Sequence, residues 1–249
     1  MLKAILFDLD NTLIIFDEVT FVRSYFNSVA EKFSDVIPAD KFAEKLWRAT
    51  MEMQNNDGSM INRQRFLNSF SAGISLTQGE IWSRFERFYN EDFDKFKYLV
   101  ARPDCAHEVF AYIQEKGLRI VIATNPIWPL SAQMRRLSWV GLNDFEIELV
   151  THIDNMTYCK PRLDYYQQIC SLIGESPQNC LMVGDDPAND MIAAKIGMRT
   201  YLTDDSLRKV EKPLEVSRRV IGDNTDDVPP ADFKGPLACV IEAIDNLIK

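Results

Sequence analysis

The sequence has few of the residues that build zinc or disulfide-stabilised sites. Its 249 residues include two histidines, His107 and His152, and five cysteines, an odd number with no Cys-x-x-Cys pair. Because the cysteines lie ten or more residues apart, we expect neither a structural zinc site nor a disulfide framework, and we expect a cytoplasmic protein. The cysteines are predicted to be small buried apolar residues.

Positive charge and long hydrophobic runs are also scarce. The first apolar run, residues 4–7, stops at Asp8, so it is too short for a signal peptide or a membrane span. The chain has 28 Lys and Arg against 37 Asp and Glu, a formal charge of −9. Since an acidic surface repels phosphate backbones and anionic lipids, neither nucleic acid nor a membrane is expected as a partner. An anionic substrate would need a local cluster of positive charge or a metal ion.

The chain does contain alternating strand and helix patterns. Apolar runs typical of buried strands cover residues 4–8, 118–123, 147–150, 180–183 and 200–202. Helical patterns cover residues 106–113, 130–140, 163–173 and 236–248. Strands separated by helices predict an α/β fold with a Rossmann-like, doubly wound parallel sheet.

Two details of these helical patterns are specific predictions. The second pattern has an apolar stripe made of Leu130, Met134, Leu137 and Val140. Glycines follow the first three patterns, and we expect them in the left-handed conformation that ends a helix: Gly117, Gly141 and Gly174.

Residues 17–98 differ from the rest, because they contain four helical stripes and no convincing strand. The last of these helices begins at a capping box, Thr77 to Glu80. We therefore expect an all-helical cap domain at residues 17–98, inserted into an α/β core made of residues 1–16 and 99–249. The polar stretch 204–235 is expected to be irregular surface chain.

The expected cap contains one polar segment of uncertain role. Residues 54–58 (Gln-Asn-Asn-Asp-Gly), with Arg63 and Arg65, could contact a substrate or could form a solvated loop between helices. Both readings stay open at this point.

Four polar motifs follow the predicted strands of the core. They are residues 8–12 (Asp-Leu-Asp-Asn-Thr), 124–126 (Thr-Asn-Pro), 160–161 (Lys-Pro) and 184–190 (Gly-Asp-Asp-Pro-Ala-Asn-Asp). Because the carboxyl ends of parallel strands meet at one edge of a sheet, these motifs should converge there. Crowded carboxylates repel one another, and a divalent cation such as Mg²⁺ relieves that repulsion.

The first motif supplies residues suited to phosphoryl transfer. Asp8, at the end of its strand, can act as a nucleophile and form an aspartyl-phosphate. Asp10 can protonate the leaving oxygen and then activate water as a base. Thr12 is assigned a supporting role.

The other motifs supply donors and further acids. Thr124, Asn125 and Lys160 can bind the oxygens of the transferring phosphoryl group. Asp185 can complete a metal site, and Asp190 can orient Lys160 or a metal-bound water.

Taken together, the motifs resemble those of the haloacid dehalogenase (HAD) superfamily. Its DxDxT, Thr, Lys-Pro and GDxxxxD motifs occur here in order between residues 4 and 197. The resemblance implies that Asp8 is the nucleophile and that Mg²⁺ is held by Asp8, by the backbone carbonyl of Asp10 and by Asp185. It also implies that the helical insert is a C1-type cap that closes over the substrate. The doubled acid leaves open whether Asp185 or Asp186 takes the metal.

The resulting prediction is a Mg²⁺-dependent phosphatase, monomer or homodimer, acting on a small phosphorylated metabolite. Dehalogenases lack the second acid of the first motif, so Asp10 favours phosphoryl over halide chemistry. A response-regulator receiver would carry its phosphorylated Asp on a later strand, and a dinucleotide-binding fold would need glycines within residues 8–12. A phosphomutase, or a ligand-binding relative without turnover, remains an alternative.

Overall fold

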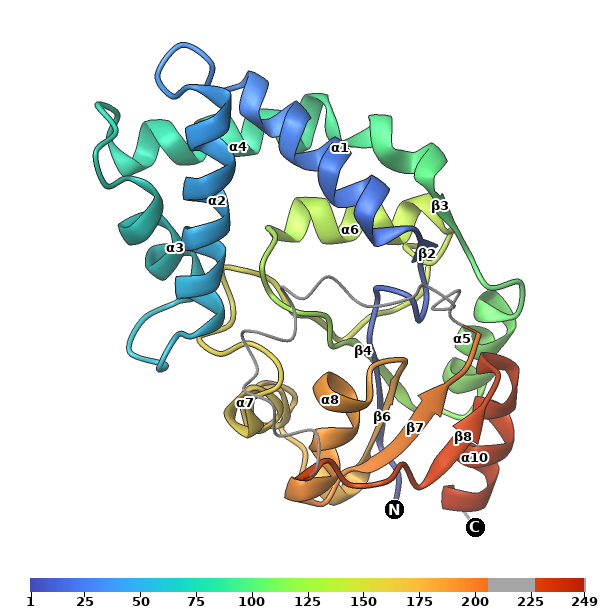
Figure 1. Cartoon of the computed structure of the whole chain (residues 1–249). Coiled ribbons are helices and arrows are strands. Elements are labelled where there is room, and N and C mark those ends of the chain that lie inside the picture. Colours follow the sequence, from blue (N-terminus) through green and yellow to red (C-terminus); the bar gives the residue numbers. More distant parts are fainter. Residues whose placement is uncertain (206–226, 249) are drawn as a thin grey trace.

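The computed structural model describes residues 1–205 and 227–248 and contains a parallel sheet beneath a group of helices (Figure 1). The sheet has six strands in the order β5-β4-β1-β6-β7-β8. The strands are β1 (Ala4–Phe7), β4 (Arg119–Ile122), β5 (Leu149–Val150), β6 (Cys180–Gly184), β7 (Arg199–Thr203) and β8 (Phe233–Gly235). The chain starts in the middle and builds first one side and then the other, which confirms the doubly wound fold.

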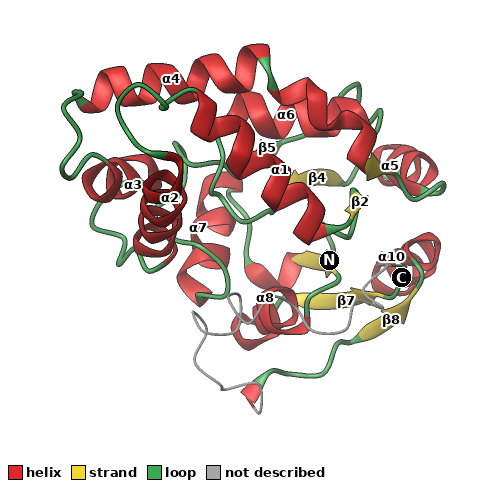
Figure 2. Cartoon of the chain, turned by 45° about the horizontal axis from the view of Figure 1, so that its top comes forward, coloured by secondary structure: helices red, strands yellow, loops and turns green. Residues whose placement is uncertain are grey.

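Both faces of the sheet are buried. On β1, Ile5 and Phe7 pack on one face with α5 (Ala106–Glu115) and α10 (Val240–Ile248), which lie together in Figure 2. Ala4 and Leu6 pack on the other face with α7 (Leu163–Ile173) and the 3₁₀ helix Met191–Ile196. Because both faces are covered, the strands read as continuous apolar runs rather than as alternating patterns.

The helices above the sheet have a separate core rich in aromatic side chains. They are α1 (Glu18–Glu31), α2 (Ala39–Gln54), α3 (Asn62–Phe70), α4 (Gln78–Glu91) and the 3₁₀ helix Phe93–Leu99. The predicted capping box is confirmed, because Thr77 Oγ1 accepts from the Glu80 N–H at 3.3 Å and the Thr77 N–H donates to Glu80 Oε2 at 2.8 Å. None of the helices in the described residues is long and apolar enough to cross a bilayer.

Two short strands join these helices to the sheet. β2 (Ile15–Phe16) and β3 (Val100–Ala101) pair antiparallel, so the outgoing and returning segments of the chain lie side by side. The helical insert runs between them, and the domain boundaries at residues 17 and 98 stay a prediction.

The prediction that residues 204–235 form irregular chain is wrong in part. Residues 233–235 form β8, which pairs with Tyr201–Thr203 of β7. Asp232 anchors this strand, because its carboxylate accepts from the Thr200 N–H at 2.9 Å. A three-residue strand shortly after two prolines is too short to show a period, so its pattern was not recognisable. Residues 206–226 of that stretch lie outside the described residues.

The stripe predicted for α6 (Leu130–Trp139) also needs correction. Leu130 is 43% exposed, whereas the polar side chains of Gln133 and Arg136 are buried. The reason is that α6 lies between the sheet and the upper helices (Figure 1), so a face other than the apolar stripe is covered as well.

The predictions for glycines and cysteines are largely confirmed. The three glycines that end predicted helices have φ of 66°, 68° and 67°. All five cysteines are free thiols; Cys159, Cys170 and Cys180 are buried, and Cys105 and Cys239 are half-buried.

Candidate active site

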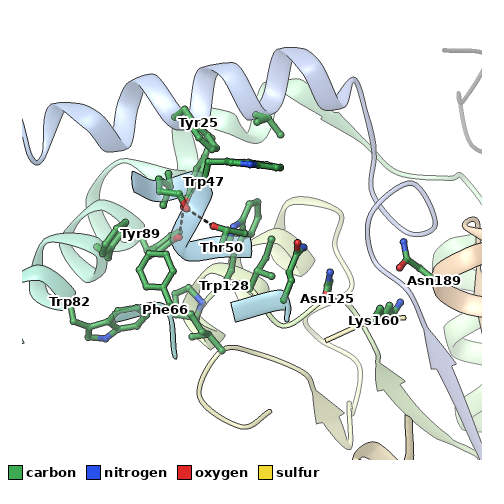
Figure 3. A pocket seen from close by; sticks show the side chains of 18 residues that line it. Tyr25, Trp47, Thr50, Phe66, Trp82, Tyr89, Asn125, Trp128, Lys160 and Asn189 are labelled. Atoms are coloured by element: carbon green, nitrogen blue, oxygen red, sulfur yellow. Dashed lines mark hydrogen bonds between the residues drawn. The ribbon is translucent and has the colours of Figure 1, made fainter. Parts of the chain in front are cut away.

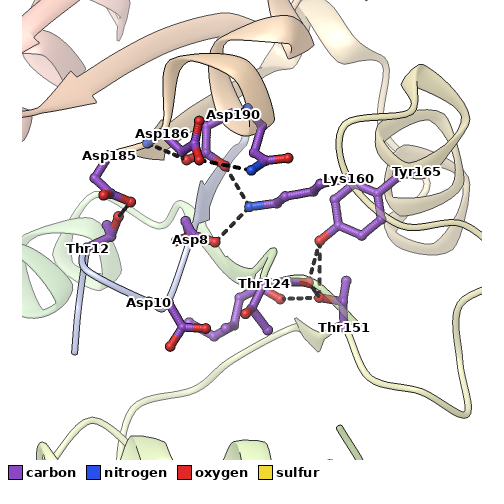
Figure 4. Close-up of polar contacts among 12 residues, drawn as sticks. Asp8, Asp10, Thr12, Thr124, Thr151, Lys160, Tyr165, Asp185, Asp186 and Asp190 are labelled. Atoms are coloured by element: carbon purple, nitrogen blue, oxygen red, sulfur yellow. Dashed lines mark hydrogen bonds and ion pairs between the residues drawn. The ribbon is translucent and has the colours of Figure 1, made fainter. Parts of the chain in front are cut away.

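The first motif lies directly beyond β1 at the carboxyl edge of the sheet (Figure 4). The Asp8 N–H donates to the Val183 carbonyl at 2.9 Å, so the backbone of Asp8 is held in the register of the sheet. The chain then turns tightly: the Leu9 carbonyl accepts from the N–H groups of Leu13 at 3.0 Å and Ile14 at 2.9 Å. Asn11 has φ of 57° in this turn, a conformation that Asn tolerates better than most residues. Asp8 is therefore rigidly placed, and Asp10 projects from the turn.

Lys160 lies between two carboxylates (Figure 4). Its Nζ donates to Asp8 Oδ1 at 2.7 Å and to Asp190 Oδ1 at 2.6 Å, and all three side chains are buried. Burial by itself would lower the pKa of Lys160, but the Asp190 and Asp8 carboxylates raise this pKa well above its usual value. Burial raises the pKa of Asp190, and the ammonium group of Lys160 opposes that rise. Lys160 therefore stays charged.

The two adjacent acids of the fourth motif have different contacts. Asp186 caps α8 (Pro187–Asp190), because its Oδ1 accepts from the N–H groups of Ala188 at 2.9 Å and Asn189 at 3.2 Å. Asp185 instead faces the first motif, where Thr12 Oγ1 donates to its Oδ1 at 3.5 Å. The geometry thus favours Asp185 over Asp186 as a candidate metal ligand.

Three buried carboxylates could hold a cation. One oxygen from each of Asp8, Asp185 and Asp190 lies within 4.8 Å of the others. If all three are ionised and Lys160 is protonated, three negative charges and one positive charge leave −2. A divalent ion that prefers carboxylate oxygen balances that charge, so the residues present fit such an ion. The Asp10 side chain is not part of this group.

Asp10 instead forms an ion pair with Arg136, a residue that the sequence analysis missed. The Arg136 side chain is buried on α6, its guanidinium carbon lies 4.4 Å from the ring centroid of Trp128, and its Nη1 donates to Gln133 Oε1 at 3.0 Å. Burial lowers the pKa of Arg136 to about 9, and the charge of Asp8 opposes this shift. The sequence contains no clear signal for this pair, because Gln133 and Arg136 lie on a helix that also carries Ser131, Arg135 and Ser138.

The Asp10–Arg136 pair should contribute to stability. Asp10→Ala would leave the buried guanidinium without its ion-pair partner, so we expect the free energy of unfolding to fall by about 2 kcal/mol; Asp10 is half-buried, which moderates the effect. In the double variant Asp10→Ala/Arg136→Met, the total loss should be about 1 kcal/mol smaller than the sum of the two single losses. Urea unfolding of the four proteins measures this coupling, and strictly additive losses would contradict it.

The second motif follows β4 and is fixed through its backbone. The Thr124 carbonyl accepts from Thr151 Oγ1 at 2.6 Å and from the Tyr165 hydroxyl at 2.8 Å, and neither bond uses the Thr124 hydroxyl (Figure 4). Thr151 and Tyr165 were not recognised as parts of the site from the sequence. Asn125 Oδ1 is buried and has no hydrogen-bond partner among the described residues. The bonds to the Thr124 carbonyl therefore leave the Thr124 hydroxyl available as a donor, whereas Asn125 can donate to a phosphoryl oxygen only through its amide NH2 group, because Oδ1 is an acceptor.

A cavity of about 260 Å³ connects these residues with the upper helices (Figure 3). Asn125, Lys160 and Asn189 line it at the sheet end. Aromatic side chains from α1, α2, α3 and α4 line the other end. The site thus opens into a pocket that can hold the remainder of a substrate.

Most of the polar residues proposed for the cap have other partners. Gln54 lines the cavity. Arg63 Nε lies 2.9 Å from Asp154 Oδ1, and Arg65 Nη2 lies 3.7 Å from Glu52 Oε2. Asn56 is buried and donates to the Asn62 side chain at 2.9 Å. Asn56, Arg63 and Arg65 are therefore held by other residues of the protein, and Gln54, at the end of α2, is the one of these four that lines the cavity.

The sequence model of one family, described as haloacid dehalogenase-like hydrolase, matches residues 2–196. The chain belongs to this family. As a HAD-like hydrolase it is an enzyme, and the four motifs that the family resemblance singled out are the ones that the fold brings to one edge of the sheet.

Relatives with assigned names are distant but extend over most of the chain. The glyceraldehyde 3-phosphate phosphatase of Methanothermobacter thermautotrophicus is 24% identical over 215 residues, which cover 85% of this chain and 90% of that protein. The ribulose-1,5-bisphosphate 5-phosphatase of Halopiger xanaduensis is 25% identical over 214 residues, 83% of this chain and 86% of that protein. The L-2-haloacid dehalogenase of Xanthobacter autotrophicus has the same fold, with a TM-score of 0.56, 14% identity and coverage of 98% and 99% of the two chains.

The fold of this HAD-like hydrolase thus brings the predicted site residues to one edge of the sheet, although not all of their side chains point toward one another. Asp8, Thr12, Lys160, Asp185 and Asp190 form one cluster. Thr124 and Asn125 lie on the neighbouring loop, Asp10 turns toward Arg136, and Asp186 caps a helix. The catalytic role of each residue stays a prediction.

Proposed function

We propose that this HAD-like hydrolase is a Mg²⁺-dependent phosphatase that hydrolyses a small phosphorylated metabolite through an aspartyl-phosphate at Asp8. The observation that carries the proposal is the Asp8 carboxylate, which is grouped with Asp185 and accepts a hydrogen bond at 2.7 Å from Lys160, a residue that lines the adjoining cavity. The names of the two phosphatase relatives support it. Asp10, the second acid, favours phosphoryl chemistry over halide removal.

In the proposed first step, an oxygen of Asp8 attacks phosphorus and the bond from phosphorus to the leaving alcohol oxygen breaks. Asp10 donates a proton to that oxygen. Lys160 has three N–H donors, of which Asp8 and Asp190 use two, so the third can bind a phosphoryl oxygen. The Thr124 hydroxyl and the Asn125 amide can supply further donors where negative charge accumulates.

In the second step, Asp10 removes a proton from a water molecule that attacks the phosphorus of the acyl phosphate. The bond between phosphorus and Asp8 breaks, which releases inorganic phosphate and restores the carboxylate. A bound Mg²⁺ would be held by Asp8, Asp185 and the Asp10 carbonyl, and would neutralise the charge between the nucleophile and the phosphate.

The proposal is tested by Mg²⁺-dependent release of phosphate. The purified protein should hydrolyse at least one member of a panel of phosphorylated sugars, nucleotides, small acids and aryl phosphates, and a chelator should lower the rate about 100-fold or more. Asp185→Asn should raise the Mg²⁺ concentration for half-maximal rate about 30-fold. Asp186→Asn should change it less than about 3-fold, because Asn is an equally good helix cap.

Two outcomes would contradict these assignments. A larger effect of Asp186→Asn than of Asp185→Asn would move the metal site to Asp186. Absence of phosphate release from every ester would reject the phosphatase.

A further inference from the structure

The cavity beside Lys160 has two chemically different ends (Figure 3). Asn125, Lys160 and Asn189 line the end at the sheet. The other end is lined largely by aromatic side chains: Tyr25, Trp47, Phe66, Trp82, Tyr89 and Trp128. An ester that places its phosphoryl group beside Lys160 must extend its alcohol portion toward these rings.

The aromatic end offers no positive charge. Among the described residues that line the cavity, Lys160 is the only charged one, and it already pairs with Asp8 and Asp190. Arg63 lies near the aromatic end, with its guanidinium carbon 5.1 Å from the Trp82 ring centroid, but it pairs with Asp154. A second phosphate or a carboxylate on the substrate would lose its hydration there without gaining a counter-ion.

The hydroxyl groups at this end already have partners. The Tyr25 and Tyr89 hydroxyls bond to each other at 2.7 Å, and Thr50 Oγ1 donates to the Leu46 carbonyl at 2.9 Å. Burial raises the pKa of Tyr25 to about 12, so this pair stays neutral. The two tyrosines carry one hydroxyl proton each, and the hydrogen bond between them uses one of these protons. The other proton remains for a single acceptor on a ligand. The Gln54 amide also lines the cavity, but most of the other side chains at this end are aromatic or aliphatic, so a sugar would find few partners for its several hydroxyls.

The cavity also has the size and the exposed apolar surface that suit an aromatic ring. Val22 and Trp47 line it and are 37% and 40% exposed, so part of their apolar surface is open to solvent. A ring bound against them would remove this surface from water. An apolar cavity of about 150 Å³ can bind benzene, so about 260 Å³ accommodates a ring and a short linker.

We propose that the substrate is a phosphate monoester of an aromatic alcohol that carries no second anionic group. This inference rests on the proposed phosphatase and specifies its leaving group. Two observations support it. The aromatic end and Lys160 line the same cavity, and among the described residues that line this cavity no other side chain is charged.

The test compares esters of equal intrinsic reactivity. 2-Phenylethyl phosphate, glycerol 3-phosphate and glucose 6-phosphate are all primary alkyl phosphates, so differences in kcat/KM report on the alcohol portion. Burial of one phenyl ring predicts a kcat/KM about 20-fold higher for 2-phenylethyl phosphate. An enzyme that hydrolyses the two polyol esters equally well or better would overturn the inference and leave the phosphatase intact.

Variants locate this preference in the cavity. Trp47→Ala should lower the preference for 2-phenylethyl phosphate about 5-fold with little effect on glycerol 3-phosphate. Tyr98→Ala is the matched control, because Tyr98 is 80% exposed and lies outside the cavity lining. Equal losses on both esters in Trp47→Ala would contradict a role in recognising the ring.

A binding measurement separates this inference from the reaction. 2-Phenylethylphosphonate cannot be hydrolysed, and its binding can be followed through the fluorescence of the tryptophans in the cavity wall. It should bind about 20-fold more tightly than methylphosphonate. If it does so while no ester is hydrolysed, the aromatic site stands and the phosphatase fails. Equal affinities would overturn the aromatic site.

Discussion

Asp8→Asn is expected to lower kcat for phosphate release by about 10⁴-fold or more. The amide is a poor nucleophile and cannot carry the phosphoryl group. The fold should persist, because the Asn Oδ1 can still accept the Lys160 hydrogen bond that Asp8 Oδ1 accepts at 2.7 Å. Steady-state phosphate release at saturating Mg²⁺ measures the effect. Asp40→Asn, which removes an exposed acid in the first turn of α2, is the matched control and should stay within about 2-fold of the parent.

The same variant tests the covalent intermediate. After rapid acid quenching with a ³²P-labelled ester, the parent protein should retain label that hydroxylamine removes, as expected of an acyl phosphate. Asp8→Asn should retain none. Retention of more than a tenth of the parental kcat would show that Asp8 is not the nucleophile.

Lys160→Met is expected to have the second largest effect, on stability and on activity together. The substitution leaves Asp8 and Asp190 buried without the ammonium that lies 2.7 Å and 2.6 Å from them. The free energy of unfolding should fall by about 3 kcal/mol, and kcat by about 10³-fold, because a donor to the phosphoryl oxygens is also lost. Urea unfolding and steady-state kinetics measure the two effects. Lys41→Met, at an exposed pair 3.5 Å from Glu44, should cost less than about 0.5 kcal/mol.

Mg²⁺ provides a separate readout for this variant. In the parent, the ammonium of Lys160 offsets one of three clustered carboxylates. Without it, the carboxylates repel one another more strongly, so Mg²⁺ should raise the Tm more in Lys160→Met than in the parent. A smaller Mg²⁺-induced rise in the variant would contradict the charge balance inferred for this cluster.

The sequence alone determined the class of fold and the order of the motifs. These features depend on local patterns: apolar runs for β1, β4, β5, β6 and β7, and glycines at helix ends that need φ near 67°. The convergence of the motifs also followed, because parallel strands present their carboxyl ends at one edge regardless of the side chains that follow. Asp8, Lys160 and Asp190 were identified in this way before their contacts were known.

Only the tertiary structure decided which polar groups face one another. The adjacent Asp185 and Asp186 have the same chemistry in sequence, and they differ because one faces Thr12 and the other caps α8. Arg136 reads as a surface residue until α6 is placed between the sheet and the upper helices, where burial and Asp10 give it a partner. The aromatic cavity arises from four helices and one loop that no local pattern relates. Local periodicity specifies which face of an element is apolar, whereas the packing of distant elements specifies what that face meets.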